Sequence, residues 1–149
     1  MEVREQVFSR QYPSSIETSR VVAEDLKLFW RESDVSDTVV VELELCVVEL
    51  VNNAYEHAYE NRDGEPIEIF SQYHNGVMII DVANFGVEMP QCQFLSALEA
   101  DFLEPEVDDP NTWSTSGRGF IILAALVDKV ELNREQNKNV FRLIKKIPL

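Results

Sequence analysis

A glutamate and an asparagine stand four residues apart in the apolar-rich stretch between Ser36 and Tyr59. If this stretch is helical, Glu49 and Asn53 project side by side from one face. An asparagine amide oxygen is a ligand that Mg²⁺ accepts when phosphates complete its shell, and nearby phosphates prepare a carboxylate to take a proton. The pair therefore indicates phosphate chemistry, although the same spacing arises by chance in many helices.

The neighbours of this pair form a polar stripe when the stretch is placed on a helical wheel at about 100° per residue. The stripe contains Glu42, Glu49, Asn52, Asn53, Glu56 and His57. Such a stripe either faces solvent or lines a pocket. Two asparagines in mid-helix each cost roughly half a kcal/mol relative to alanine, which favours the pocket. His57 is interpreted either as a phosphate contact or as a hydrogen-bonded packing residue.

A second candidate is Asp81, which follows the apolar run VMII at the end of a predicted central strand. An ionised carboxylate in that position needs hydrogen-bond donors, and the exocyclic amine of adenine is one of them. The alternative is an ordinary strand-end aspartate that begins a turn with Asn84 and Gly86.

The third candidate is the run STSGRGFIIL, which combines hydroxyl residues and two glycines with the start of an apolar helix. Backbone N–H groups of such a loop, together with the helix N-terminus, form an anion site. The alternative is a capped helix whose glycines only make the turn. The run is neither a Walker A loop nor a dinucleotide-binding fingerprint.

Hydrophobic periodicity and turn residues predict the elements that position these candidates. In chain order we expect a strand over 3–12, helices over 16–32 and 37–59, strands on either side of Asn75-Gly76, a short helix within a long loop, a helix over 119–127 and two closing strands. Asn-Gly supplies the positive φ of a tight hairpin. This order predicts an α+β fold, a two-layer sandwich in which helices cover one face of a mixed, mostly antiparallel sheet.

Composition limits the function classes. A length of 149 residues suits a single domain, 1–149. The net charge of −14 disfavours direct binding to nucleic acid or to an anionic membrane. Cys46 and Cys92 offer neither a disulfide framework nor a zinc-ligand spacing, and no apolar run is long enough for a membrane span. We therefore expect a cytoplasmic protein with no membrane segment.

The segments ELVNNAYEHAYE, DVANFG and SGRGFIIL, in this order, resemble those of the Bergerat-fold (GHKL) ATPases, and more closely the anti-sigma factor serine/threonine protein kinases. The likeness extends from about residue 7 to residue 147. It implies one histidine-kinase-like ATPase domain that uses ATP and Mg²⁺, with an ATP lid at about 86–116.

The resemblance also implies a role for each candidate residue. Glu49 corresponds to the catalytic base and Asn53 to the magnesium ligand. Asp81 would receive the adenine amine. The other residues implied in ATP binding are His57, Ala83, Gly86, Ser116, Gly117, Arg118, Gly119 and Phe120.

By the same resemblance, the protein would phosphorylate a serine of a STAS-domain anti-anti-sigma protein, sequester a sigma factor or similar regulator, and form a homodimer. One feature departs from the family pattern, because Ala83 and Phe85 stand where the first glycine box has glycines. The alternative is therefore a catalytically weak or inactive module of the same fold that acts by partner binding alone. A plain ATP-hydrolysing regulatory domain is a third reading.

Overall fold

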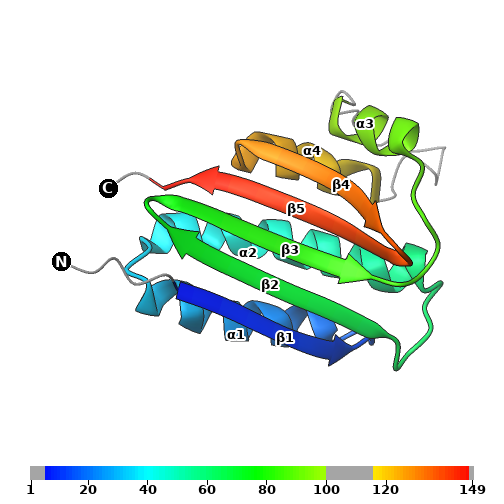
Figure 1. The fold of residues 1–149 in the computed structure, drawn as a ribbon, viewed down its shortest axis with the longest axis horizontal. Coiled ribbons are helices and arrows are strands. Elements are labelled where there is room, and N and C mark those ends of the chain that lie inside the picture. The colour runs from blue at the N-terminus through cyan, green and yellow to red at the C-terminus, as the bar shows by residue number, and fades with distance from the viewer. Residues whose placement is uncertain (1–5, 100–115, 148–149) are drawn as a thin grey trace, which may run out of the picture.

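The fold is known from a computed structural model, which describes residues 6–99 and 116–147 (Figure 1). Its elements are β1 (Gln6–Pro13), α1 (Thr18–Glu32), α2 (Asp37–Asn53), the π-helical turn η1 (Ala54–Ala58), β2 (Pro66–His74), β3 (Val77–Asn84), α3 (Gln91–Glu99), α4 (Ser116–Leu126), β4 (Lys129–Glu135) and β5 (Lys138–Lys146). The predicted element order is confirmed.

The sheet has the strand order β1-β2-β3-β5-β4, and each of these neighbouring pairs is antiparallel. A mixed sheet was predicted, so the described strands are more regular than expected. The β2–β3 hairpin turns at Asn75 and Gly76, whose φ angles are +50° and +77°. Both values lie in the left-handed region that an Asn-Gly turn requires, so the predicted hairpin is confirmed.

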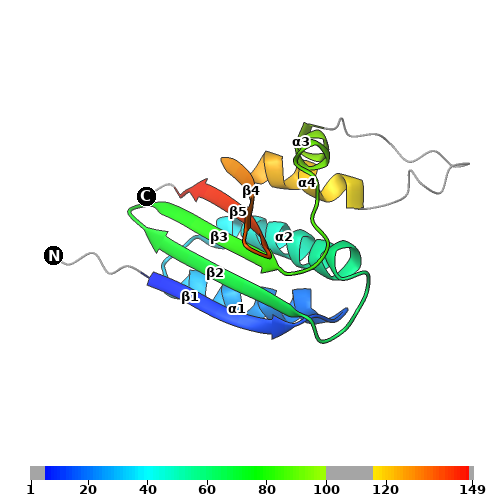
Figure 2. The ribbon, with the colours of Figure 1, turned by 45° about the vertical axis from the view of Figure 1, so that its right-hand side comes forward.

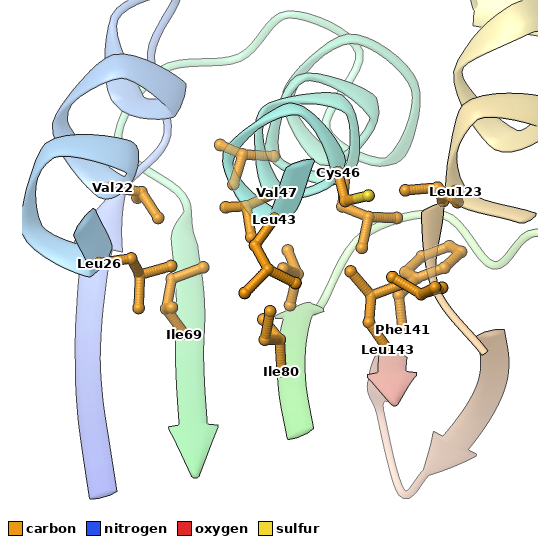
Figure 3. Packing of buried hydrophobic residues seen from close by; sticks show 14 of the residues in the cluster. Val22, Leu26, Leu43, Cys46, Val47, Ile69, Ile80, Leu123, Phe141 and Leu143 are labelled. Carbon is orange, nitrogen blue, oxygen red and sulfur yellow. The ribbon is translucent and has the colours of Figure 1, made fainter. Parts of the chain in front are cut away.

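Helices α1, α2 and α4 lie on one face of the sheet (Figures 1 and 2). The core lies between the two layers, as Figure 3 shows for side chains of α1, α2 and α4 that meet side chains of β2, β3 and β5. The labelled members of this core are Val22, Leu26, Leu43, Cys46, Val47, Ile69, Ile80, Leu123, Phe141 and Leu143. The predicted α+β sandwich is confirmed.

The helix that carries the polar stripe begins as its sequence predicts. Ser36 is the N-cap of α2, and its hydroxyl accepts a hydrogen bond from the backbone N–H of Val39. The end differs from the prediction, because α2 gives way after Asn53 to η1, in which the N–H of Tyr59 bonds to the carbonyl of Ala54. Single π-helical turns are frequent at functional sites.

The long segment predicted as a lid contains one described helix. Phe94 of α3 packs edge-on against Phe120 of α4 and Phe141 of β5. These contacts anchor α3 beside α4 (Figure 2). The remainder of the predicted lid, 100–115, lies outside the described residues.

Both cysteines are free. Cys46 is buried in the core, and burial raises the pKa of its thiol to about 12, whereas Cys92 is exposed. A thiol with such a pKa is inert at neutral pH. Within residues 6–99 and 116–147, none of the helices combines the length and the apolar character needed to span a membrane.

Candidate functional site

Polar side chains at the end of α2 and in η1 line a small cavity of about 50 Å³. Its walls are Glu49, Asn52, Asn53, Glu56 and His57 from this one helix, together with Gly119 and Phe120 of α4. The polar stripe therefore borders a pocket over its C-terminal half. Its first member, Glu42, lies farther along α2 and pairs with Lys145 at 3.3 Å.

Glu49 lies between the two helices that form this cavity. Partial burial raises the pKa of its carboxyl group, and the negative charge of Glu56 raises this pKa further. Gly119 lies so close to the Glu49 carboxylate that a Cβ at position 119 would overlap Oε2 of Glu49. A carboxylate with a raised pKa at the wall of a cavity is suited to accept a proton.

A larger cavity of about 280 Å³ adjoins the first, and Asn53, His57 and Phe120 line both. The other residues that line it are Ala58, Asn84, Val87, Glu88, Met89, Pro90, Gln93, Ala97, Asn139 and Phe141. Its lining is more apolar than that of the small cavity. The two together offer one polar chamber and one mainly apolar chamber, joined at the end of α2.

The loop after β3 is fixed against η1 by backbone contacts. The N–H of Val87 donates to the carbonyl oxygen of Ala58 at 2.9 Å. Gly86 lies so close to this carbonyl that a Cβ there would overlap it. The hydroxyl of Tyr59 accepts from the N–H of Phe85 at 2.8 Å and donates to the carbonyl of Pro66. Gly86 is therefore required for the close approach between this loop and η1.

Asp81 and Ala83 do not join the other candidates, and the prediction that they do needs correction. Side chains alternate between the two faces of a strand. Met78, Ile80 and Val82 of β3 are buried in the core beneath the helices. Asp81 and Ala83 have the opposite parity and face the uncovered side of the sheet.

On that uncovered side, Asp81 accepts two hydrogen bonds from Arg142, at 2.8 and 2.9 Å. Asp81 and Ala83 line a hollow of about 600 Å³ there, with equal numbers of acidic and basic residues around it. The acidic ones are Glu68, Asp81 and Glu135, and the basic ones are Arg10, Lys138 and Arg142. This carboxylate already has charged donors and does not reach the cavities beside α2.

The residue that sequence analysis missed is Asn84. It ends β3, is 1% exposed and lines the larger cavity with Asn53 and His57. The sequence analysis considered Asn84 only as part of a turn after Asp81, although the neighbouring Gly86 was among the candidate residues. Asn84 is three positions beyond Asp81, so the two side chains lie on opposite faces of β3. The alternation of side chains would have revealed this if the register of the strand had been known.

The predicted anion loop is described in part. Ser116, Gly117 and Arg118 begin α4, but their side chains lie outside the described residues. Gly119 and Phe120 both line the small cavity. Their position in the first turns of α4 brings the positive end of a helix to this cavity.

The sequence profile of the histidine kinase-like ATPase domain matches residues 12–145, which is most of the chain. The chain belongs to this family. The match includes α2, the loop after β3 and the start of α4, which are among the segments that line the two cavities of this ATPase domain. A search of curated proteins finds no match.

Solved structures share the fold of this ATPase domain at low sequence identity. The RsbU and RsbW domains of Rv1364c from Mycobacterium tuberculosis match 95% of the chain with a TM-score of 0.65 and 15% identity. The SiaB–SiaC complex from Pseudomonas aeruginosa contains a chain that matches 93% of it, with a TM-score of 0.66 and 13% identity. The Acinetobacter baumannii histidine kinase AdeS matches all of it, with a TM-score of 0.52 and 13% identity.

The chain covers very different fractions of the three neighbouring structures. The chain spans 32% of the M. tuberculosis chain, 89% of the P. aeruginosa chain and 70% of AdeS. At these identities the likeness establishes the fold of the ATPase domain.

Proposed function

We propose that this protein is a serine/threonine protein kinase of the anti-sigma type, dependent on ATP and Mg²⁺. The observation that carries the proposal is the pair of adjoining cavities, in which Glu49 lines the polar chamber and Asn53 lines both the polar and the apolar chamber. A nucleoside triphosphate has the same division into a charged and an aromatic end. Membership of the ATPase family supports this choice of ligand.

The apolar chamber is assigned to the base and the polar chamber to the phosphates. The first turn of α4, which includes Gly119, directs free backbone N–H groups toward the phosphates. Asn53 would hold Mg²⁺ through its amide oxygen, with phosphate and water oxygens as the other ligands. When bound, the ion neutralises phosphate charge and orients the γ-phosphoryl group.

Glu49 is assigned the role of general base. In this mechanism its carboxylate accepts the proton of the substrate serine hydroxyl. The serine oxygen forms the new bond to the γ-phosphorus, the bond from that phosphorus to the bridging oxygen of ADP breaks, and ADP leaves. The raised pKa of Glu49, caused by burial and by Glu56, increases its ability to hold the proton.

The proposed protein substrate is a STAS-domain anti-anti-sigma protein, and the proposed target is a sigma factor or a similar regulator in the cytoplasm. The fold neighbours include a chain with RsbU and RsbW domains and the SiaB–SiaC complex, which support a place in partner switching. The net charge of −14 favours a partner with a basic surface. A homodimer is part of the same proposal.

A second candidate is a partner-binding module with weak or no catalysis. The observation that favours it is the lining of the polar chamber, where the described residues include two glutamates and no lysine or arginine to neutralise phosphates. In this case the chain would occupy its partner without transferring a phosphoryl group.

Incubation with γ-labelled ATP, Mg²⁺ and a STAS-domain protein encoded beside it separates the two candidates. We expect transfer to the partner, and a fall by about two to four orders of magnitude in Glu49→Gln, the usual contribution of a general base. Asn53→Ala should weaken both nucleotide binding and transfer. Glu44→Gln is the matched control, because Glu44 pairs with Lys27 of α1, away from the cavities. Nucleotide binding without transfer by the unaltered protein would favour the partner-binding module.

A further inference from the structure

The row of side chains that contains Glu49 continues along α2 in the direction away from the cavities. Val41, Leu45 and Glu49 are spaced four residues apart, so their side chains project from one face of the helix on successive turns. Val41 is 55% exposed and Leu45 is 50% exposed, and neither residue lines either cavity. Two exposed apolar side chains therefore share the helix face of the proposed general base.

Helix α4 runs alongside this part of α2. At the start of α4, Gly119 lies against Glu49. At the end of α4, the carbonyl of Leu126 accepts a hydrogen bond from Lys145, which also pairs with Glu42 of α2 at 3.3 Å. The middle of α4 therefore lies beside the middle of α2, and Figure 3 shows the two helices next to each other.

The neighbouring side of α4 adds apolar surface to this row. Ile122 and Ala125 follow Gly119 by three and six residues, so they lie close to the helix face that meets α2. Ile122 is half-buried and Ala125 is exposed. Together with Val41 and Leu45 they form what we call the α2–α4 patch. Single exposed apolar residues are common on proteins, whereas a group of them marks an interaction surface.

The two carboxylates of α2 nearest to Leu45 already have basic partners. Glu42 pairs with Lys145 at 3.3 Å, and Glu44 pairs with Lys27 at 3.2 Å. A partner that covered an unpaired carboxylate would leave a buried charge, which is costly. In a chain with a net charge of −14, paired carboxylates make this surface suited to apolar contact.

The proposed phosphoryl transfer requires a protein to lie over this region. The hydroxyl of the substrate serine must come within hydrogen-bond reach of the Glu49 carboxylate. At a rise of about 1.5 Å per residue, Leu45 lies about 6 Å and Val41 about 12 Å from Glu49 along the helix axis. The protein surface that surrounds the serine therefore extends over the patch.

We propose that the α2–α4 patch is the docking surface for the serine-bearing protein substrate, which presents apolar side chains about 6 and 12 Å from its serine. This inference rests on the proposed function. The patch does not touch the reacting atoms, so its contacts are the same before and during the transfer. Such contacts determine the affinity for the substrate and leave the rate of the bound complex unchanged.

The test compares the KM and the dissociation constant of the STAS-domain partner between the unaltered protein and Leu45→Gln. Glutamine has a helix propensity close to that of leucine but does not favour apolar contact. We expect both constants to rise about tenfold, the effect of losing the burial of one leucine. The kcat and the affinity for Mg-ATP should not change, because Leu45 lines neither cavity. Val41→Thr should raise both constants by a smaller factor.

Leu28→Gln is the matched control. Leu28 is 62% exposed on α1, which lies on the other side of α2 from α4 (Figure 3). This variant should keep both constants of the parent. Unchanged partner affinity in Leu45→Gln, or an equal loss in Leu28→Gln, overturns the inference while the proposed function stands. Circular dichroism checks that each variant folds, and if Leu45→Gln does not, Val41→Thr decides.

Failure of the proposed function gives a different result. If the unaltered protein binds the partner without transferring a phosphoryl group, the kinase proposal fails, and the dissociation constants of the same variants still decide the docking surface. If the unaltered protein does not bind the partner, the proposed function and this inference are overturned together.

Discussion

The backbone of Gly119 lies against the carboxylate of Glu49, with no room for a side-chain carbon between them. Gly119 belongs to α4 and Glu49 to α2, so this contact joins two elements that are far apart in the sequence. The atom that a Cβ would displace is the end of a flexible side chain. The lack of a side chain at position 119 therefore determines where the Glu49 carboxylate lies.

Gly119→Ala should accordingly reduce phosphoryl transfer without reducing stability. Alanine is favourable in a helix, so the melting temperature should be unchanged or slightly higher. The displaced carboxylate should lower the transfer rate by up to about a hundredfold, as misplacement of a catalytic group by 1 Å does. Thermal unfolding and single-turnover transfer measure the two effects. Undiminished transfer would show that the position of Glu49 is not critical.

The substitution of Gly86 by alanine should, in contrast, reduce the stability of the fold. A Cβ at Gly86 would overlap the backbone carbonyl of Ala58, which cannot rotate away as a side chain does. Gly86→Ala should therefore destabilise the fold by about 1–3 kcal/mol, the usual cost of overpacking. Denaturant unfolding measures this cost, and Gly119→Ala is the matched control. Equal stability of the two variants would contradict the described contact between the loop and η1.

Glu49→Gln should stabilise the unliganded protein at neutral pH. The pKa of Glu49 is raised in the folded state, so folding favours its protonated form. Its contribution to stability is then fully present below the ordinary glutamate pKa and is lost as pH rises through the raised value. The melting temperature of the variant should exceed that of the parent at about pH 7, and the difference should vanish at about pH 4 and below. A difference that grows as pH falls would contradict the raised pKa.

Glu56→Gln should move the acidic limb of the transfer rate to lower pH. The charge of Glu56 contributes to the raised pKa of Glu49, so its removal lowers that pKa. The base is then deprotonated, and active, at a lower pH. The pH dependence of the transfer rate measures the shift, with Glu44→Gln as the control that leaves the profile in place. An unmoved limb would indicate that a different group controls the rate.

Local signals in the sequence were sufficient for the order of elements. Ser36 caps α2, and Asn75-Gly76 turns the β2–β3 hairpin, because each preference depends on the backbone of a few residues. The Glu49–Asn53 pair was placed correctly on one helix face for the same reason. The π-helical form of η1 was not predicted, since the wide turn depends on contacts with the loop after β3.

The face of the sheet to which Asp81 belongs could not be read from the sequence. The run before it is apolar at every position, so Ile79 and Ile80 are equally plausible core residues. A shift of one residue in register exchanges the two faces of a strand. The pairing of Asp81 with Arg142 depends on the neighbour that β3 acquires in the sheet, and β5 lies about sixty residues farther along the chain.

The wide turn of η1 also limits the deletions that this helix can tolerate. A π-helical turn contains one residue more than an α-helical turn, so η1 is equivalent to a single-residue insertion in the helix that α2 begins. Deletion of one residue there would let the α-helix continue and rotate everything beyond it by about 100°. The Ala58 carbonyl would then turn away from Val87 and Gly86. At this point the chain accommodates substitutions far more readily than gaps.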